Sequence, residues 1–131
     1  MACPFFQPAA PFSWEEWPNP PRMTLGDPHS GACTAEVSEV TAARVKTCCN
    51  TGYARGVCPS FPQGEAPDAV RFGIVSREAG AFRIRYVRER DHHPYDDGVL
   101  QIPEAAAQGE LPSTLERQAR AFLESYLRRS L

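Results

Sequence analysis

Five cysteines constrain this chain more than any other feature, because three of them crowd into one short segment. These three are Cys48, Cys49 and Cys58, whereas Cys3 and Cys33 lie far upstream. Thiolates are soft ligands, and four of them around one point suit Zn²⁺ or an iron–sulfur cluster. An odd number of cysteines also fits four ligands and a spare better than a closed set of disulfides. We therefore predict one cysteine-ligated centre that ties distant parts of the chain together.

The predicted ligands of this centre are Cys3, Cys33, Cys49 and Cys58, with Cys48 as the alternative to Cys49. Cys48 falls on the apolar face of the helix predicted before it, where a cysteine behaves as a small hydrophobe. Structural zinc sites usually contain a short Cys-x2–4-Cys pair, and no two of these four ligands have that spacing. Cys3 and Cys58 are each followed by proline, as is the last cysteine of the bacterial ferredoxin motif. These features favour a [4Fe–4S] cluster as the cofactor, with Zn²⁺ as the alternative.

The wide separation of the ligands is loosely similar to that in the iron–sulfur modules attached to helicases, nucleases and glycosylases. This resemblance implies a cluster-binding fold and no activity, because the catalytic motifs of those enzymes are absent from the sequence. Four protein thiolates would leave no iron position open to a substrate. Electron transfer or redox sensing, with an unknown protein as redox partner, is therefore the expected function.

Two other functions stay open. The first is a binding module in which structural zinc supports the fold and an arginine-rich hairpin contacts an acidic protein or a nucleic acid. Its candidate contact residues are Arg71, Arg83, Arg85 and Arg88, and the net charge of −2 makes a nucleic acid the less favoured partner. The second is an enzyme with a reactive cysteine. The sequence favours a protein without catalytic activity, because it contains neither a Gly-x-Ser-x-Gly elbow nor a phosphate loop.

The compartment is predicted from the N-terminus and from the lack of long apolar runs. The first residues have neither the basic region nor the apolar region of a signal peptide. No apolar run approaches the length that spans a membrane. We expect a cytoplasmic protein without membrane contact, in a compartment where thiols are normally kept reduced.

The length and composition predict one small domain of the α+β class, residues 1–131, in three stretches. Residues 1–32 are rich in proline and aromatic residues, and they are expected to form a wrapping arm in which the prolines block regular ladders. Residues 33–67 are predicted to be a cysteine-rich helix, over 35–48, followed by a loop. Residues 68–131 are predicted to hold a hairpin and a C-terminal helix.

A short antiparallel sheet is predicted from alternating residues in the C-terminal half. Apolar side chains alternate with other residues, many of them arginines, over 69–77 and over 81–90, which predicts a hairpin. Residues 99–102 are expected to add a third short strand after a turn at 96–98. Such a sheet needs a cover over its apolar face.

The cover is predicted to be a helix at about 114–129. Ser113 and Glu116 form a capping box at its start. The residues that follow place an apolar stripe at helical spacing, made of Leu115, Ala119, Phe122, Leu123, Tyr126 and Leu127.

The only other cluster of candidate ligands in the sequence is at 91–97, where His92 and His93 lie among three aspartates. Adjacent side chains on an extended segment point to opposite faces, so the two histidines are poorly placed to share a metal. A polar turn is the favoured interpretation, and the role of these two histidines stays open.

Overall fold

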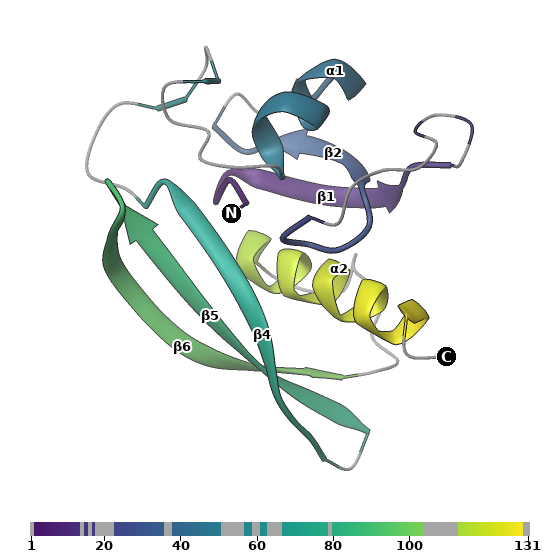
Figure 1. Cartoon of the computed structure of the whole chain (residues 1–131), viewed down its shortest axis with the longest axis vertical. Helices are drawn as coiled ribbons and strands as arrows, with labels where there is room; N and C mark the ends of the chain where they lie inside the picture. The colour runs from purple at the N-terminus through teal and green to yellow at the C-terminus, as the bar shows by residue number, and fades with distance from the viewer. Residues whose placement is uncertain are drawn as a thin grey trace.

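Two three-stranded antiparallel sheets, with helix α2 between them, form the framework of the computed structural model (Figure 1). The chain is thus a small mixed α+β fold, which confirms the predicted class. No helix in the described part combines the length and apolar character that crossing a membrane requires. The structure describes residues 2–13, 15, 17, 23–35, 38–50, 57–58, 61–62, 67–78, 80–103 and 113–129.

The larger sheet is built from the alternating segments of the C-terminal half. Its strands β4 (Ala69–Glu78), β5 (Ala81–Arg90) and β6 (His93–Pro103) pair in the order β4-β5-β6. Strands β4 and β5 are the hairpin that the alternating pattern predicts. Gly80 lies in their connection at φ +82°, a left-handed conformation that glycine adopts without strain.

Strand β6 is much longer than the predicted strand at 99–102, and the turn predicted at its start is wrong. Asp96 accepts a hydrogen bond from Arg88, with Oδ1 2.6 Å from Nε. Asp97 accepts one from Arg85, with Oδ2 3.0 Å from Nη2. Because opposite charges on neighbouring strands stabilise a sheet, these pairs hold both aspartates within β6.

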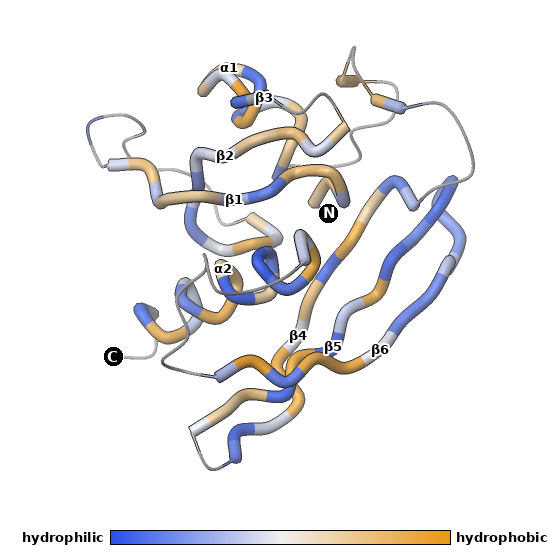
Figure 2. The backbone as a smooth tube through the Cα atoms, turned by 180° about the vertical axis from the view of Figure 1, so that it is seen from behind, coloured by the Kyte–Doolittle hydropathy of each residue, from blue (hydrophilic) through white to orange (hydrophobic). Residues whose placement is uncertain are grey.

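The turn between β5 and β6 lies instead at Asp91 and His92. Their φ angles of 51° and 63° are the positive values that tight hairpin turns use. The carboxylate of Asp68 supports this turn by accepting a hydrogen bond from the Asp91 backbone N–H at 2.9 Å. Figure 2 shows that this end of the sheet is predominantly hydrophilic.

The smaller sheet lies in the proline-rich N-terminal half. Strands β1 (Phe6–Pro11), β2 (His29–Cys33) and β3 (Ser38–Glu39) pair in the order β1-β2-β3. The expectation that prolines would keep residues 1–32 out of a ladder is therefore wrong. Strand β1 is an edge strand with a register shift after Pro8, and an edge or a bulge is where a sheet tolerates proline.

The helix predicted over 35–48 is shorter and changes type along its length. Strand β3 occupies part of the predicted span, and α1 (Ala42–Arg44) begins only after it. The Thr41 hydroxyl caps α1 by accepting a hydrogen bond from the Arg44 backbone N–H at 3.3 Å. The chain continues as η1 (Val45–Cys49), a π-helical turn that includes the cysteine pair.

Helix α2 (Thr114–Arg129) spans the predicted residues. Its N-terminus is capped by Ser113, whose Oγ accepts a hydrogen bond from the Glu116 backbone N–H at 3.1 Å. The ring of Phe122 packs against that of Phe72, with centroids 5.9 Å apart. A buried cluster joins the helix to the larger sheet and contains Phe82, Ile84, Ile102, Ala119 and Leu123.

A second buried cluster lies toward the smaller sheet. It draws on the N-terminal loop, the strands and η1, and it contains most of the cysteines. Its members are Ala2, Cys3, Phe6, Leu25, Val40, Val45, Cys48, Cys49 and Val70. Three of the five cysteines therefore belong to a hydrophobic core.

Candidate cysteine centre

The five cysteines come from four parts of the chain and meet at this second core. Cys3, Cys48 and Cys49 are buried within it, and Cys33 and Cys58 pack against it while partly exposed. All five are free thiols. The fold thus brings the four predicted ligands and the alternative, Cys48, to one region.

Backbone hydrogen bonds fix the loop that carries Cys3. The Cys3 N–H donates to the carbonyl oxygen of Cys49 at 2.9 Å, which joins the loop to the end of η1. Ala2 and Val70 exchange two hydrogen bonds of 2.9 Å, which join the loop to β4. From the other side, Gln118 Nε2 of α2 donates to the Cys3 carbonyl oxygen at 2.8 Å. Three elements therefore hold Cys3 against the cysteine pair.

The thiols of Cys3 and Cys49 are held in their protonated form by their surroundings. Burial, which disfavours a charged thiolate, raises the pKa of Cys3 to about 11 and the pKa of Cys49 to about 12. Negative charge on the sulfurs of Cys33 and Cys58 would add to the rise in the pKa of Cys3, and negative charge on those of Cys3, Cys48 and Cys58 would add to that of Cys49.

One cationic side chain, that of Arg44, lies among the cysteines. Arg44 Nη2 lies 3.4 Å from Cys58 Sγ, which allows its N–H to donate to the sulfur. The Arg44 charge also acts to lower the pKa of Cys49, although burial outweighs it. Cys48 has a different neighbour, because Thr47 Oγ1 lies 3.4 Å from its Sγ.

The thiols share a core without forming a ready-made ligand set. Within the described ranges, no group of three or more histidine, cysteine, aspartate or glutamate side chains is arranged to hold a metal ion. Part of the segment around Cys58, at 51–56 and 59–60, lies outside the described residues.

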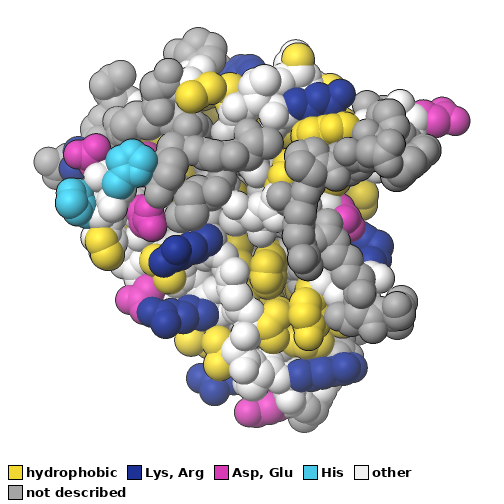
Figure 3. All heavy atoms as spheres, in the orientation of Figure 1, with side chains coloured by type: hydrophobic (Ala, Val, Ile, Leu, Met, Phe, Trp, Pro, Cys, Tyr) yellow, Lys and Arg dark blue, Asp and Glu magenta, His cyan; other side chains and the backbone are white. Residues whose placement is uncertain are grey.

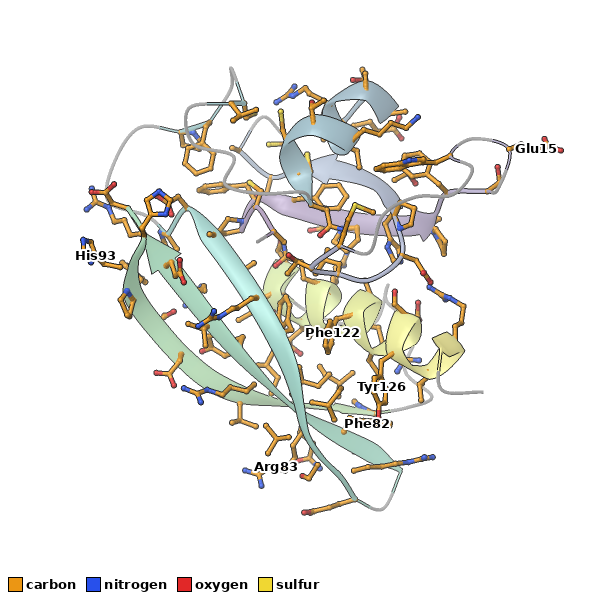
Figure 4. All side chains as sticks on the ribbon, in the orientation of Figure 1. Glu15, Phe82, Arg83, His93, Phe122 and Tyr126 are labelled. Carbon is orange, nitrogen blue, oxygen red and sulfur yellow. The ribbon has the colours of Figure 1, made fainter. Side chains whose placement is uncertain are left out.

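The two histidines singled out in the sequence lie at the hydrophilic tip of the larger sheet. His92 occupies the tight turn and His93 begins β6, and both are exposed. In Figure 4 the labelled His93 lies at the outer end of the sheet. This placement agrees with the polar turn that the sequence favoured.

Three polar residues near the cysteines were not predicted from the sequence. Arg44 contacts a thiol, Gln118 holds the Cys3 loop, and Asn50 Oδ1 accepts a hydrogen bond from the Leu25 backbone N–H at 3.1 Å. A signal existed for Gln118, which stands between Leu115 and Phe122 at helical spacing and so falls on the apolar face. A polar residue on such a face commonly has a buried partner.

Comparisons with known proteins identify no relative. No protein-family model, curated protein or solved structure matches the chain.

Proposed function

We propose that this protein binds a [4Fe–4S] cluster through Cys3, Cys33, Cys49 and Cys58 and acts in electron transfer or redox sensing with a protein partner. One observation supports this most strongly: free cysteines from four parts of the chain gather at one core. In this proposal the centre lies under the N-terminal segment, and α2 covers the larger sheet. We place the function in the cytoplasm, where free thiols persist.

The donor set fits a soft metal centre. Thiolate sulfurs bind iron and zinc. Protonated thiols in a core pack only as small apolar side chains do, so packing alone does not explain why so many cysteines lie together. Because burial disfavours the free thiolates of Cys3 and Cys49, loading such a site must release their protons. The bound cluster would supply a one-electron redox couple.

The chain's own groups would offset the negative charge of the ligands. Backbone hydrogen bonds at Phe5 and Phe6 act to lower the pKa of Cys3, and these groups would stabilise its sulfur as a ligand. Arg44 would do the same for Cys58 through its 3.4 Å contact. Hydrogen bonds to ligand sulfurs are among the factors that set a cluster's reduction potential.

The alternative is a binding module with structural zinc in the same place, in which the arginine-rich hairpin makes the functional contact. Its ligands would be the same cysteines, since zinc also accepts four thiolates. Bound metal and acid-labile sulfide distinguish the two, because only the cluster contains inorganic sulfide.

Serine substitutions test which thiols are ligands. We expect Cys3→Ser, Cys33→Ser, Cys49→Ser and Cys58→Ser each to lose most of the bound iron and sulfide after purification without oxygen. Cys48→Ser is the matched control, because it makes the same chemical change beside Cys49 and should keep both. Iron, sulfide and zinc are measured per chain, and circular dichroism checks that each variant is folded.

The pattern across the variants decides the outcome. Equal metal content in all five serine variants would contradict both metal proposals. If Cys48→Ser loses the bound iron and sulfide and Cys49→Ser keeps them, Cys48 is the ligand in place of Cys49, and the proposed centre stands.

A further inference from the structure

The larger sheet has one face that α2 does not contact. Side chains alternate between the faces of a strand, and Phe72 and Phe82 belong to the face packed toward α2. In Figure 4, Phe82 points toward Tyr126 of α2, whereas the neighbouring Arg83 points away from the helix. We call the opposite side the outer face; its residues are Arg71, Gly73, Ser76, Arg83, Arg85, Val87, Glu89, Asp97, Val99 and Gln101.

The outer face alternates arginines with small apolar residues. In the ladders, Arg71 lies opposite Val87, and Arg85 lies between Gly73 and Val99. Val99 is 47% exposed. Figure 3 shows basic side chains among hydrophobic ones over this sheet, where every basic residue other than histidine is an arginine.

The outer face has a small excess of positive charge, because it holds the arginines Arg71, Arg83 and Arg85 and the carboxylates of Glu89 and Asp97. Asp97 pairs with Arg85, and both side chains are more than half exposed. Among the described residues, Arg71 and Arg83 have no ion-pair partner. Arg88, the fourth predicted contact residue, is engaged elsewhere, because it forms an ion pair with Asp96 and lies over the ring of Tyr86.

A shallow hollow lies between two of these arginines. Its volume is about 270 Å³, and Arg71, Phe72, Gly73, Arg85 and Val87 line it. A Cβ atom at Gly73 would have no heavy atom within 4 Å, and the φ of Gly73 is not in the left-handed region. Neither packing nor backbone conformation therefore requires a glycine here.

An unneeded glycine in a strand is informative because it weakens the strand, by roughly 0.5–1 kcal/mol relative to alanine. Glycine inside a strand often marks a place where a ligand or another backbone approaches closely. At Gly73 the approaching group would meet two guanidinium groups. Guanidinium binds carboxylates through paired hydrogen bonds.

We propose that the outer face binds an acidic segment of a partner protein, with a carboxylate seated over Gly73 between Arg71 and Arg85. The exposed Val99 and the half-buried Val87 suit the apolar side chains of a protein segment. Single-stranded nucleic acid is less well matched, since its bases stack on aromatic rings, and Phe72 and Tyr86 belong to the other face. The inference does not depend on which metal the cysteines bind.

The binding test uses the full chain and a short fluorescein-labelled peptide in which glutamate alternates with valine. Fluorescence anisotropy measures its affinity, with a glutamine–valine peptide and a single-stranded DNA oligonucleotide as comparison probes. We expect the glutamate peptide to bind at least about tenfold more tightly than the glutamine peptide. Added salt should weaken this binding.

Variants locate the site. Arg71→Gln/Arg85→Gln should weaken peptide binding about tenfold, since each lost ion pair contributes a fraction of a kcal/mol to more than 1 kcal/mol. Arg77→Gln/Arg117→Gln carries the same change in charge outside the outer face and should bind like the unmodified protein. Gly73→Val fills the hollow, where it has open space, so it should keep the thermal stability and lose binding.

Several results would overturn the proposal. They are absence of binding to the glutamate peptide, equal weakening by the two double variants, unchanged binding by folded Gly73→Val, and tighter binding of the oligonucleotide than of the peptide.

Discussion

Arg44 places a cationic side chain in contact with the cysteine core. The contact of its Nη2 with Cys58 Sγ places a permanent positive charge beside a partly exposed thiol. At Cys3 and Cys49 burial is the main influence, and it raises the pKa of both thiols.

His29, at the start of β2, is a buried ionisable residue outside the cysteine set. Its side chain is 1% exposed, and its Nδ1 lies 2.8 Å from the carbonyl oxygen of Asp27. Nε2 is buried without a hydrogen-bond partner in the described part of the chain. Burial lowers the pKa of His29 below its ordinary 6.5, and the nearby Arg128 lowers it further. The carboxylates of Glu124 and Asp27 oppose this shift without reversing it.

This lowered pKa predicts how stability depends on pH. Above about pH 6.5 the imidazole is neutral in both the folded and the unfolded chain, so it does not change the free energy of unfolding. As the pH falls below 6.5 the unfolded chain takes up a proton that the folded chain resists, so the free energy of unfolding falls until the lower folded pKa is reached. The contribution is at most about 1.4 kcal/mol per pH unit.

Urea unfolding between about pH 7 and 5 measures this dependence. His29→Gln removes the titrating group, so its free energy of unfolding should fall less steeply with decreasing pH. His93→Gln, at the exposed tip of the sheet, is the matched control and should behave like the unmodified protein. Identical pH dependence in all three proteins would contradict the role of His29.

Helix α2 is the element that joins the two halves of the fold. One side of it shares a core with the larger sheet. On another side Gln118 donates hydrogen bonds to the carbonyl oxygens of Cys3 and Phe6, at 2.8 and 2.6 Å. Near its C-terminus, Ser125 Oγ accepts a hydrogen bond from the Asp27 backbone N–H at 3.0 Å. The cysteine core therefore depends on a helix far away in sequence.

The packing of α2 against the loop at Gly26 predicts unequal effects of two similar substitutions. Gly26 and Gly80 have nearly the same φ, +84° and +82°. Alanine at either position destabilises the folded state by about 1–2 kcal/mol, because a residue with a Cβ atom is strained in the left-handed conformation. At Gly26 the new Cβ would also overlap Ser125 of α2, whereas at Gly80 it would have no heavy atom within 4 Å.

Gly26→Ala should therefore lower the free energy of unfolding by about 3 kcal/mol or more, because overpacking adds about 1–3 kcal/mol to the conformational cost. Gly80→Ala should lower it by only about 1–2 kcal/mol. Urea unfolding of both variants provides the comparison. A similar loss at the two positions would show that the contact between α2 and the loop contributes little.

Across the molecule, the parts predicted correctly from the sequence are those fixed by local patterns. The alternation over β4 and β5 and the capping box at Ser113 involve neighbouring residues, so the pattern itself carries the information. The extent of β6 was missed because two aspartates and a glycine resemble a turn. Their place in the strand depends on Arg85 and Arg88 on the neighbouring strand.

The N-terminal half was harder to predict because its structure depends on distant partners. Strand β1 pairs with β2 across a long connection, and no local signal marks an edge strand that contains prolines. For the candidate site, the chemistry of thiols was enough to nominate Cys3, Cys33, Cys49 and Cys58 as a set. The supporting contact from Gln118 arises only in the folded chain, since it comes from the opposite end of the sequence.

The cysteine-ligated cluster is tested most directly by purifying the unmodified protein without oxygen and measuring iron, sulfide and zinc together with its visible absorption. We expect a coloured protein with sulfur-to-iron charge-transfer absorption and about four irons and four sulfides per chain. A colourless protein with about one zinc per chain would contradict the cluster and support the structural zinc site. A protein with no bound metal would contradict the cysteine centre altogether.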